Sequence, residues 1–326
     1  MKKWMALIFI SFMTLTLAAC GAEGETSGEE ANGGDGAPAG DGDNFVFGYT
    51  SMTQNNPFFQ VLEEAIREEV EANGDELITT NPAMDVSLQI NQIEDMITQG
   101  IDAIFLNPVD WEGIRPALEM LEEAEIPIIN YDTEVKDMEY VTAYVGSDNK
   151  NAGRVAGDDM VKRFPEGGKI AVLDSPTMNS VNDRIEGFME AIDGQNFEIV
   201  AQQDARGDLE TALTITEDIL QSHPDIIAIM GGNDPTALGA LAAAKAANVS
   251  DIAIYGVDGS PDAKAEIAEG GMLVGSGAQS PISIGVESVK VAYQILNGEE
   301  YEERVPVETF LINGDNVDEY GVDGWQ

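Results

Sequence analysis

Short polar side chains follow several apolar runs of the sequence, each at the point where the run ends. They are Asn56, Asp132, Asn233 and Asp258. An arginine, Arg184, precedes another apolar stretch, and two aromatic residues, Phe58 and Phe59, follow the first run. Carboxylate and amide groups can bridge neighbouring hydroxyls, a guanidinium donates to two oxygens at once, and an aromatic face covers apolar C–H groups. These residue types are suited to holding a molecule rich in hydroxyl groups.

Each of these residues also has an ordinary structural explanation. Asn56 fits a helix cap, with the two phenylalanines that follow it in the core. Asn233 and Asp258 fit caps and turns, and an isolated arginine such as Arg184 is more often a surface ion-pair partner. Their shared position at the ends of successive apolar runs is what favours a common binding site.

The sequence contains no motif that marks a catalytic or metal site. Its single histidine, His223, precedes a proline where a helix is predicted to end, so we interpret it as a helix-end residue. A Cys/His cluster, a Gly-x-Ser-x-Gly motif and a phosphate-binding Gly-Lys loop are all absent. We therefore predict a protein that is not an enzyme and uses no catalytic residue, metal or cofactor. A glycosidase with paired carboxylates stays an alternative, because the chain holds 60 acidic residues.

Short apolar runs alternate with amphipathic stretches along the chain. The predicted strands are 45–49, 77–79, 103–106 and 127–130 in a first set, and 169–173, 197–201, 226–230, 252–257 and 272–275 in a second set. The predicted helices are 58–70, 86–97, 114–124, 184–192, 209–221, 237–246 and 263–269. Apolar strands followed by crossover helices predict two doubly wound parallel-sheet α/β domains. Ligands of such sheets bind outside the carboxyl ends of the strands, where the polar residues above are found.

The start of the chain has the pattern of a lipoprotein signal peptide. Two lysines precede an apolar run over residues 4–17, which is shorter than the roughly 20 residues that a membrane-spanning helix needs. Leu17-Ala18-Ala19-Cys20 then forms a lipobox. We expect residues 1–20 to be the signal, with the only cysteine, Cys20, as the lipidation site that holds the protein on the extracytoplasmic face of the cell membrane. Residues 21–43 have no large apolar side chain and are predicted to form a disordered acidic linker.

The formal net charge of −44 limits the possible partners. Such a surface repels nucleic acid and anionic lipid headgroups, so we expect no nucleic-acid partner. We interpret the charge as an adaptation of the surface and not as part of a site. A transcriptional regulator would need a helix-turn-helix near the amino end, where this chain has the signal and linker patterns.

The same residues carry a family resemblance over nearly all of residues 45–326. The motifs are Asn55-Asn56-Pro57-Phe58-Phe59, Asn107-Pro108, Ile126-Pro127-Ile128-Ile129 with Asp132, Ser147-Asp148-Asn149, Arg184 before Glu186-Gly187-Phe188, His223-Pro224-Asp225, Asn233-Asp234 with Ala237-Leu238-Gly239-Ala240, Gly256 with Asp258-Gly259, and Gln279. In this order they resemble the ribose/galactose type of periplasmic sugar-binding protein, and most closely its ribose-binding members. The resemblance implies a type I periplasmic binding fold, in which a three-segment hinge joins two doubly wound domains.

The resemblance also implies a role for each matching residue. The implied sugar-binding residues are Asn56, Phe58, Phe59 and Asp132 in the first domain, Arg184, Asn233 and Asp258 in the second, and Gln279 in the hinge. The implied domains are 44–147 plus 280–307 and 148–279 plus 308–326. In this family the two domains close over the ligand, and the closed form is recognised by the permease subunits of an ABC transporter.

Two positions depart from the pattern of ribose binders. Those proteins have an arginine after the binding aspartate, whereas this chain has Asp132-Thr133. They also place an aromatic residue from the second domain against the sugar, whereas the matching stretch 204–208 has none. Arg206 is a candidate to replace the lost guanidinium, and Tyr131 or Trp111 is a candidate for the second aromatic face.

We interpret the chain as the substrate-binding lipoprotein of an ABC-type sugar importer, which binds a small neutral sugar in the interdomain cleft. A pentose, a hexose, a cyclitol and a furanose-like molecule all fit the altered pocket. The alternative is a sensory protein that presents its ligand to a membrane receptor. The sequence leaves both open, because both functions need the same closed cleft.

Overall fold

The structure is a computed structural model that describes residues 44–326. Its strands are β1 (Val46–Thr50), β2 (Glu76–Thr80), β3 (Ala103–Leu106), β4 (Ile128–Tyr131), β5 (Ala143–Ser147), β6 (Gly168–Asp174), β7 (Phe197–Asp204), β8 (Ala228–Gly231), β9 (Ala253–Asp258), β10 (Leu273–Ala278), β11 (Arg304–Val307) and β12 (Phe310–Asn313). Its helices are α1 (Pro57–Ala72), α2 (Val86–Gln99), α3 (Arg115–Glu123), η1 (Met138–Tyr140), α4 (Asn149–Arg163), α5 (Asn179–Ile192), α6 (Leu209–Ser222), α7 (Asp234–Ala246), α8 (Pro261–Ala268), α9 (Pro281–Leu296) and α10 (Val317–Tyr320). The predicted signal peptide with Cys20 and the predicted linker lie outside the described residues.

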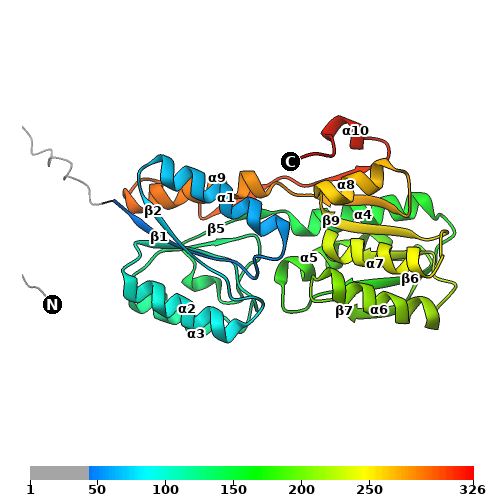
Figure 1. Ribbon diagram of the computed structural model, residues 1–326, viewed down its shortest axis with the longest axis horizontal. Helices are drawn as coiled ribbons and strands as arrows, with labels where there is room; N and C mark the ends of the chain where they lie inside the picture. The colour runs from blue at the N-terminus through cyan, green and yellow to red at the C-terminus, as the bar shows by residue number, and fades with distance from the viewer. Residues whose placement is uncertain (1–43) are drawn as a thin grey trace, which may run out of the picture. The chain divides into compact units, whose positions relative to one another are not determined.

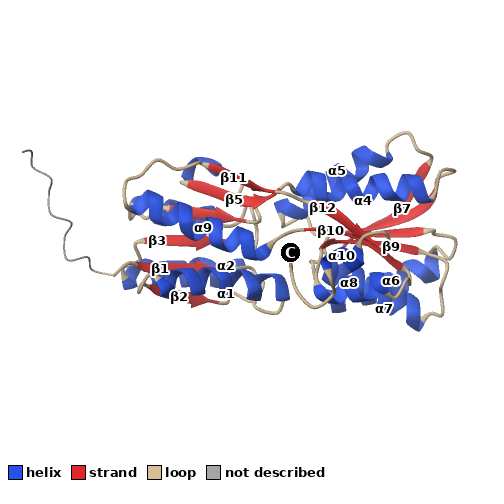
Figure 2. Cartoon of the chain, turned by 90° about the horizontal axis from the view of Figure 1, so that it is seen from above, coloured by secondary structure: helices blue, strands red, loops and turns tan. Residues whose placement is uncertain are grey.

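The strands form two six-stranded sheets (Figures 1 and 2). Sheet A has the order β11-β5-β4-β3-β1-β2, and all its neighbouring strands are parallel. Sheet B has the order β12-β10-β9-β8-β6-β7, and only β12 is antiparallel to its neighbour. In each sheet the first strand lies between two later strands, so the strand order reverses beside it. Such a reversal opens a crevice at the carboxyl ends of the strands.

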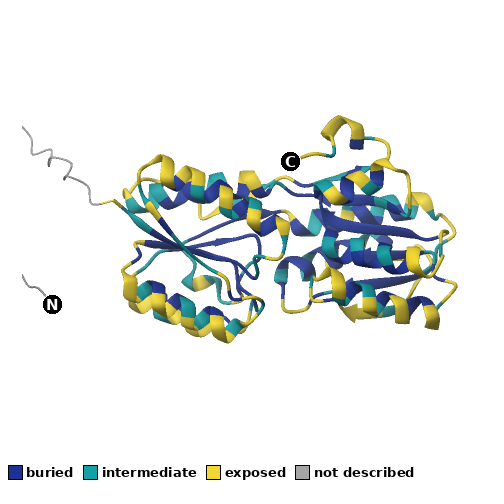
Figure 3. Cartoon of the chain, in the orientation of Figure 1, coloured by how far each residue is buried: buried dark blue, intermediate teal, exposed yellow. Residues whose placement is uncertain are grey.

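Helices cover both faces of each sheet. In Figure 1, α1 and α9 lie on one face of sheet A and α2 and α3 on the other, while the pairs α4–α5 and α6–α7 pack together beside sheet B. The strands are accordingly buried (Figure 3), with Phe47, Tyr49 and Val172 fully shielded from solvent. Burial on both faces explains why the strands read as continuous apolar runs. The predicted fold class of two parallel-sheet α/β domains is confirmed, and we call them domain A and domain B after their sheets.

The chain passes between the two domains three times. It leaves domain A between β5 and α4, returns between β10 and α9, and crosses again between β11 and β12. These passages are the three-segment hinge that the resemblance implies. The predicted domain boundaries, 44–147 plus 280–307 and 148–279 plus 308–326, stay a prediction at the level of single residues.

Several elements were not predicted from the sequence, and α4 shows why. Its buried residues are Asn149, Ala152, Gly153, Ala156, Gly157 and Met160, which are mostly small and do not produce a strong apolar period. By contrast, α2 begins and ends where its capping residues predict. Asp85 accepts hydrogen bonds at the amino end, and Gly100 follows the last turn with a φ of 82°.

Within residues 44–326, no helix combines the length and the apolar character that crossing a membrane requires.

Candidate functional site

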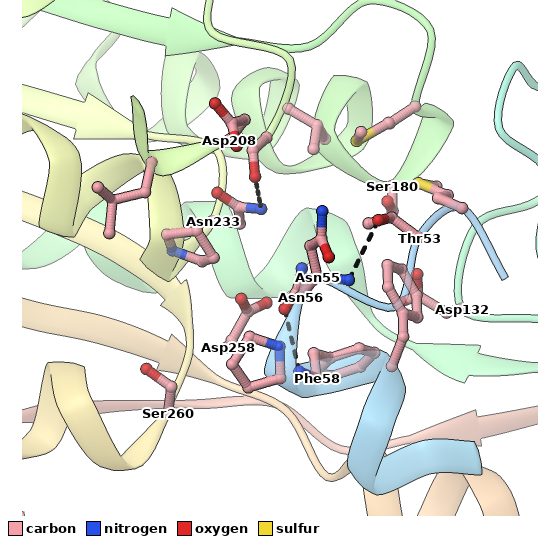
Figure 4. Close-up of a pocket in the computed structure, with 18 of the residues that line it drawn as sticks. Thr53, Asn55, Asn56, Phe58, Asp132, Ser180, Asp208, Asn233, Asp258 and Ser260 are labelled. Carbon is pink, nitrogen blue, oxygen red and sulfur yellow. Dashed lines mark hydrogen bonds between the residues drawn. The ribbon is translucent and has the colours of Figure 1, made fainter. Parts of the chain in front are cut away.

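A cavity of about 480 Å³ is lined by residues of both domains (Figure 4). Its volume lies within the range of about 300–1,000 Å³ that is typical of small-molecule sites. The lining includes every residue predicted to bind ligand: Asn56, Phe58, Phe59, Asp132, Arg184, Asn233, Asp258 and Gln279. The structure therefore brings these residues together, while their contact with a ligand stays a prediction.

The amino end of α1 places Asn56 and the two phenylalanines at the cavity. The Asn56 side-chain oxygen accepts a hydrogen bond from the Phe58 backbone N–H at 3.0 Å, and Pro57 occupies the first helical position. Phe58 and Phe59 are buried, and their rings meet edge to face at 5.5 Å between centroids. The structural and binding interpretations of this motif are thus compatible. The cap uses the Asn56 oxygen and leaves its amide nitrogen available to the cavity.

Asp132 follows β4 and is turned toward the cavity by an unusual backbone. Its φ is 58°, a left-handed conformation that costs a residue other than glycine about 1–3 kcal/mol. The Oδ2 oxygen accepts hydrogen bonds from Asn107 Nδ2 and Thr133 Oγ1, both at 3.1 Å. The Oδ1 oxygen is buried and has no hydrogen-bond partner among the described residues. A buried acceptor without a partner is costly, so this oxygen marks a place for a donor from outside the chain.

Arg184 lies in α5 and is buried between the carboxylates of both domains. Its Nε donates to Asn149 Oδ1 at 2.8 Å, and its Nη1 donates to the Gly232 carbonyl at 3.0 Å. Its guanidinium lies 3.9 Å from Asp132 Oδ1 and 3.6 Å from Asp258 Oδ1. These last two distances are charge contacts and are too long for hydrogen bonds.

Close packing of α4 on α5 fixes the position of Arg184. A Cβ atom on Gly153 of α4 would come within 1.7 Å of the Arg184 carbonyl oxygen. A Cβ atom on Gly187 of α5 would come within 1.9 Å of the Lys150 carbonyl oxygen. Glycine at both positions therefore lets the two helix backbones approach, and this approach carries the guanidinium to the cavity.

Asp258 and Gln279 form a second polar group at the ends of β9 and β10. Asp258 Oδ1 accepts from Gln279 Nε2 at 2.8 Å, and Asp258 Oδ2 accepts from the Asp234 backbone N–H at 3.3 Å. The φ of Asp258 is 140°, so this strand also ends in a strained aspartate. Gln279 Oε1 is a further buried acceptor without a hydrogen-bond partner among the described residues.

Asn233 is held at the start of α7. Its side-chain oxygen accepts from the Thr236 N–H at 3.0 Å, and its Nδ2 donates to the Gly207 carbonyl at 3.1 Å. Both of its functional groups thus have protein partners, unlike those of Asn56. Its predicted ligand contact would have to add to these bonds or replace one of them.

Burial dominates the electrostatics of the site. It raises the pKa of Asp132, although Arg184 and the hydrogen bonds from Thr133 and Asn107 act in the opposite direction. Burial also raises the pKa of Asp258 to about 8; Arg184 opposes this shift, and the charges of Asp234 and Asp132 add to it. The cavity lining therefore holds more buried carboxylates than buried cations. This excess favours proton uptake by an aspartate, or binding of a ligand that donates several hydrogen bonds.

Thr133, which replaces the arginine of ribose binders, joins the two domains. Its hydroxyl lies 2.7 Å from the Ser180 hydroxyl at the start of α5. A second bond between the domains runs from the Trp111 backbone N–H to the Thr177 carbonyl at 3.0 Å. Thr133 thus takes part in a hydrogen bond between the domains.

The candidates for the missing aromatic face are corrected by the structure. Tyr131 is fully buried: its ring stacks on Tyr49, its hydroxyl donates to the Thr50 carbonyl at 3.0 Å, and it does not line the cavity. Trp111 does not line the cavity either, and its ring lies 5.7 Å from the Lys136 ammonium. Arg206 does reach the lining, at its exposed rim.

Sequence reasoning missed Trp325, which lines the cavity and packs against Phe58. It lies far from any strand end, after α10, where no motif marks it. The arrangement as a whole can bind and desolvate hydroxyl groups. Among residues 44–326, no group of His, Cys, Asp and Glu side chains is placed to hold a metal ion.

Comparisons with known proteins agree with this geometry. Residues 47–300 match the family described as periplasmic binding protein domain. The ribose import binding protein of Bacillus subtilis (strain 168) is 32% identical over 306 residues, which cover 94% of this chain and 97% of that protein. The ribose import binding protein of Escherichia coli (strain K12) is 32% identical over 261 residues, which cover 80% and 88% respectively.

Solved structures include similar proteins with hydroxyl-rich molecules bound. An ABC transporter solute-binding protein from Mycobacterium smegmatis, solved with glycerol, has a TM-score of 0.81 and 32% identity, and the match covers 85% of this chain and 96% of that one. Another from Bacillus halodurans C-125, solved with myo-inositol, has a TM-score of 0.79 and 32% identity, with coverage of 86% and 98%.

Proposed function

The chain belongs to the periplasmic binding protein family, among the extracytoplasmic solute-binding proteins of sugar ABC transporters, and on this basis we propose its specific role. It is the substrate-binding lipoprotein of an ABC-type importer and binds a small neutral sugar, a pentose or a hexose, between its two domains. Its relatives are substrate-binding proteins of transporters, which are not enzymes. Its partners are the sugar, the permease subunits and, through Cys20, the membrane.

One observation carries this proposal. Buried acceptors of both domains, Asp132 Oδ1 and Gln279 Oε1, have no hydrogen-bond partner among the described residues, and both residues line the same cavity. A sugar hydroxyl donates one hydrogen bond and accepts others. A bound sugar can therefore donate to these two oxygens and accept hydrogen bonds from Arg184 or Asn56. The phenylalanines beside them could cover the apolar face of its ring.

Thermal unfolding with a panel of ligands tests this function. The panel contains pentoses, hexoses, deoxy sugars and cyclitols, each added to the purified protein. A ligand that binds only the folded state at 100 times its Kd stabilises that state by about 2.7 kcal/mol, which raises the melting temperature. Calorimetry then gives the affinity of each hit. A charged amino acid or peptide that binds while every sugar fails would contradict the proposal.

Membrane anchoring is tested separately, because it depends on residues outside the described part of the chain. In the Cys20→Ala variant we expect loss of lipid labelling and release of the protein from the membrane fraction, while ligand binding is unchanged. A variant that stays lipid-labelled would show that Cys20 is not the attachment point.

Transport is distinguished from signalling by deletion of the gene. We expect the deletion strain to lose uptake of the bound sugar at low concentration, and the wild-type gene to restore it. Normal uptake combined with a lost transcriptional or chemotactic response would favour the sensory alternative instead.

A further inference from the structure

The segment after α10 reaches the cavity through a single aromatic side chain. Trp325 lines the cavity, and its ring lies 5.7 Å from that of Phe58, with 73° between the ring planes. This segment follows β12 of sheet B, whereas Phe58 belongs to α1 of domain A. Figures 1 and 2 place the end of the chain between the two domains, near α8 and α10. The Trp325–Phe58 contact therefore links the two domains.

A buried lysine ties the same segment to domain B. Lys264 of α8 is fully shielded from solvent, and its ammonium donates a hydrogen bond to the Gly324 carbonyl, one residue before Trp325. A buried lysine is rare because its charge loses hydration, and here burial lowers the pKa of Lys264 while Asp234 and Asp323 act against that shift. Within the described residues, the Gly324 carbonyl is the hydrogen-bond partner of this ammonium.

The cavity lining on the domain B side is poor in aromatic residues. The residues that α5, the 204–208 stretch and the starts of α6, α7 and α8 contribute to the lining include no aromatic ring. Trp325 is the aromatic lining residue that comes from the domain B side. It is partly exposed and packs at the edge of the core that contains Phe58.

We propose that Trp325 is a specificity-determining residue of the ligand site, and that Lys264 is its positioning residue. This inference depends on the proposed function, since it concerns the same cavity. The indole extends the aromatic wall of Phe58 and covers an apolar C–H face of the sugar. Through the Lys264–Gly324 bond, the indole is held over the cavity from domain B while it contacts domain A.

Affinity measurements on single variants test the role of Trp325. For a sugar that binds the wild type, we expect Trp325→Ala to weaken binding about tenfold or more and to change the affinity ranking of pentoses, hexoses and cyclitols. Trp325→Phe retains part of the affinity. The matched control is Tyr320→Ala, an aromatic at the end of α10 that stacks on Phe310 and does not line the cavity. Wild-type affinity and ranking in Trp325→Ala overturn the proposal.

Fluorescence and a double-mutant cycle test the role of Lys264. In the full chain with Trp4→Phe and Trp111→Phe, Trp325 is the only one of the 3 tryptophans that remains. Adding Lys264→Met should shift its emission toward that of a solvated indole, and sugar should change its emission only when Lys264 is present. The affinity losses of Lys264→Met and Trp325→Ala should not add, because both act through one indole. Additive losses, or an unchanged emission, show that Lys264 does not position Trp325.

The outcomes separate this inference from the proposed function. If no sugar binds the wild type, the proposed function fails. If the wild type binds a sugar and Trp325→Ala binds it equally well, the function stands and this inference fails.

Discussion

The two walls of the cavity differ in their chemistry. Domain A contributes the rings of Phe58 and Phe59 together with one buried carboxylate, Asp132, whereas domain B contributes the buried cation Arg184 and a second carboxylate, Asp258. Neither wall is complete by itself. The guanidinium that faces Asp132 belongs to the other domain, at 3.9 Å. The pairing of Asp132 with Arg184 therefore depends on the approach of the two domains, whereas Asp258 and Arg184 pair within domain B.

The two walls also share one backbone feature. In each domain an aspartate with positive φ lies at the carboxyl end of a strand: Asp132 follows β4 with a φ of 58°, and Asp258 is the last residue of β9 with a φ of 140°. Both oxygens of Asp258 accept hydrogen bonds from the protein, whereas Asp132 keeps one oxygen without a partner among the described residues. Asp258 is thus held by its own domain, and Asp132 is the carboxylate that has most to gain from a ligand.

Removing the cation that serves both walls should have the largest effect. In Arg184→Met, Asp132 and Asp258 lose their shared counter-charge, so we expect sugar binding to become undetectable and the free energy of unfolding to fall by about 3–5 kcal/mol. Denaturant melts and calorimetry measure the two effects. Arg206→Met is the control, because Arg206 lines the exposed rim, and its unfolding free energy should change by less than about 0.5 kcal/mol. An Arg184→Met protein with wild-type affinity would disprove the shared counter-charge.

The raised pKa of Asp258, about 8, predicts a pH-dependent affinity. Hydroxyl donors bind the carboxylate better than the acid, so binding releases a proton, and affinity should rise up to about tenfold per pH unit between roughly pH 6 and 8 and then level off. Stability runs the other way. The raised pKa favours the acid form in the folded state, and this contribution is complete below the unfolded pKa, near 4, and is lost as the pH rises through about 8.

Calorimetry across this pH range, in buffers of different ionisation enthalpy, measures the released proton directly. In Asp258→Asn the pH dependence should flatten, apart from what the buried Asp132 and Asp234 beside it contribute. If the wild type has equal affinities at the two ends of this pH range, ligand binding does not depend on the ionisation of Asp258.

The smallest expected effect comes from the two asparagines that cap helices on opposite walls. Serine is as good a cap as asparagine, so Asn56→Ser should leave the unfolding free energy within about 0.5 kcal/mol while affinity falls about tenfold through loss of the amide. Asn233→Ser also loses the bond to Gly207 and should destabilise the protein by about 1 kcal/mol. Equal stability losses in thermal melts of the two variants would show that the Asn233–Gly207 bond does not distinguish the two caps.

The fold and most of the cavity could be predicted from the sequence because both depend on local patterns. Continuous apolar runs such as 252–257, followed by amphipathic helices, are typical of parallel strands buried on both faces, so the elements could be read in order. Parallel strands bring their carboxyl ends to one edge of their sheet, so Asp132 and Asp258 could each be assigned to the ligand-binding edge of their own sheet. The family resemblance then implied that both edges face one cleft. The sequence was less informative for α4, whose small buried residues give a weak period, and for β7, which extends to Asp204 beyond the predicted 201.

The sequence by itself determined the class of the protein, its strand-end residues and the excess of carboxylates in the site, because these follow from residue type and short-range order. Tertiary structure alone decided that Thr133 bonds to Ser180, that Tyr131 is directed into the core and that Trp325 reaches Phe58. Each of these contacts joins residues that are far apart in the chain or on different domains. Such contacts depend on how helices and sheets pack, and no local pattern records that packing.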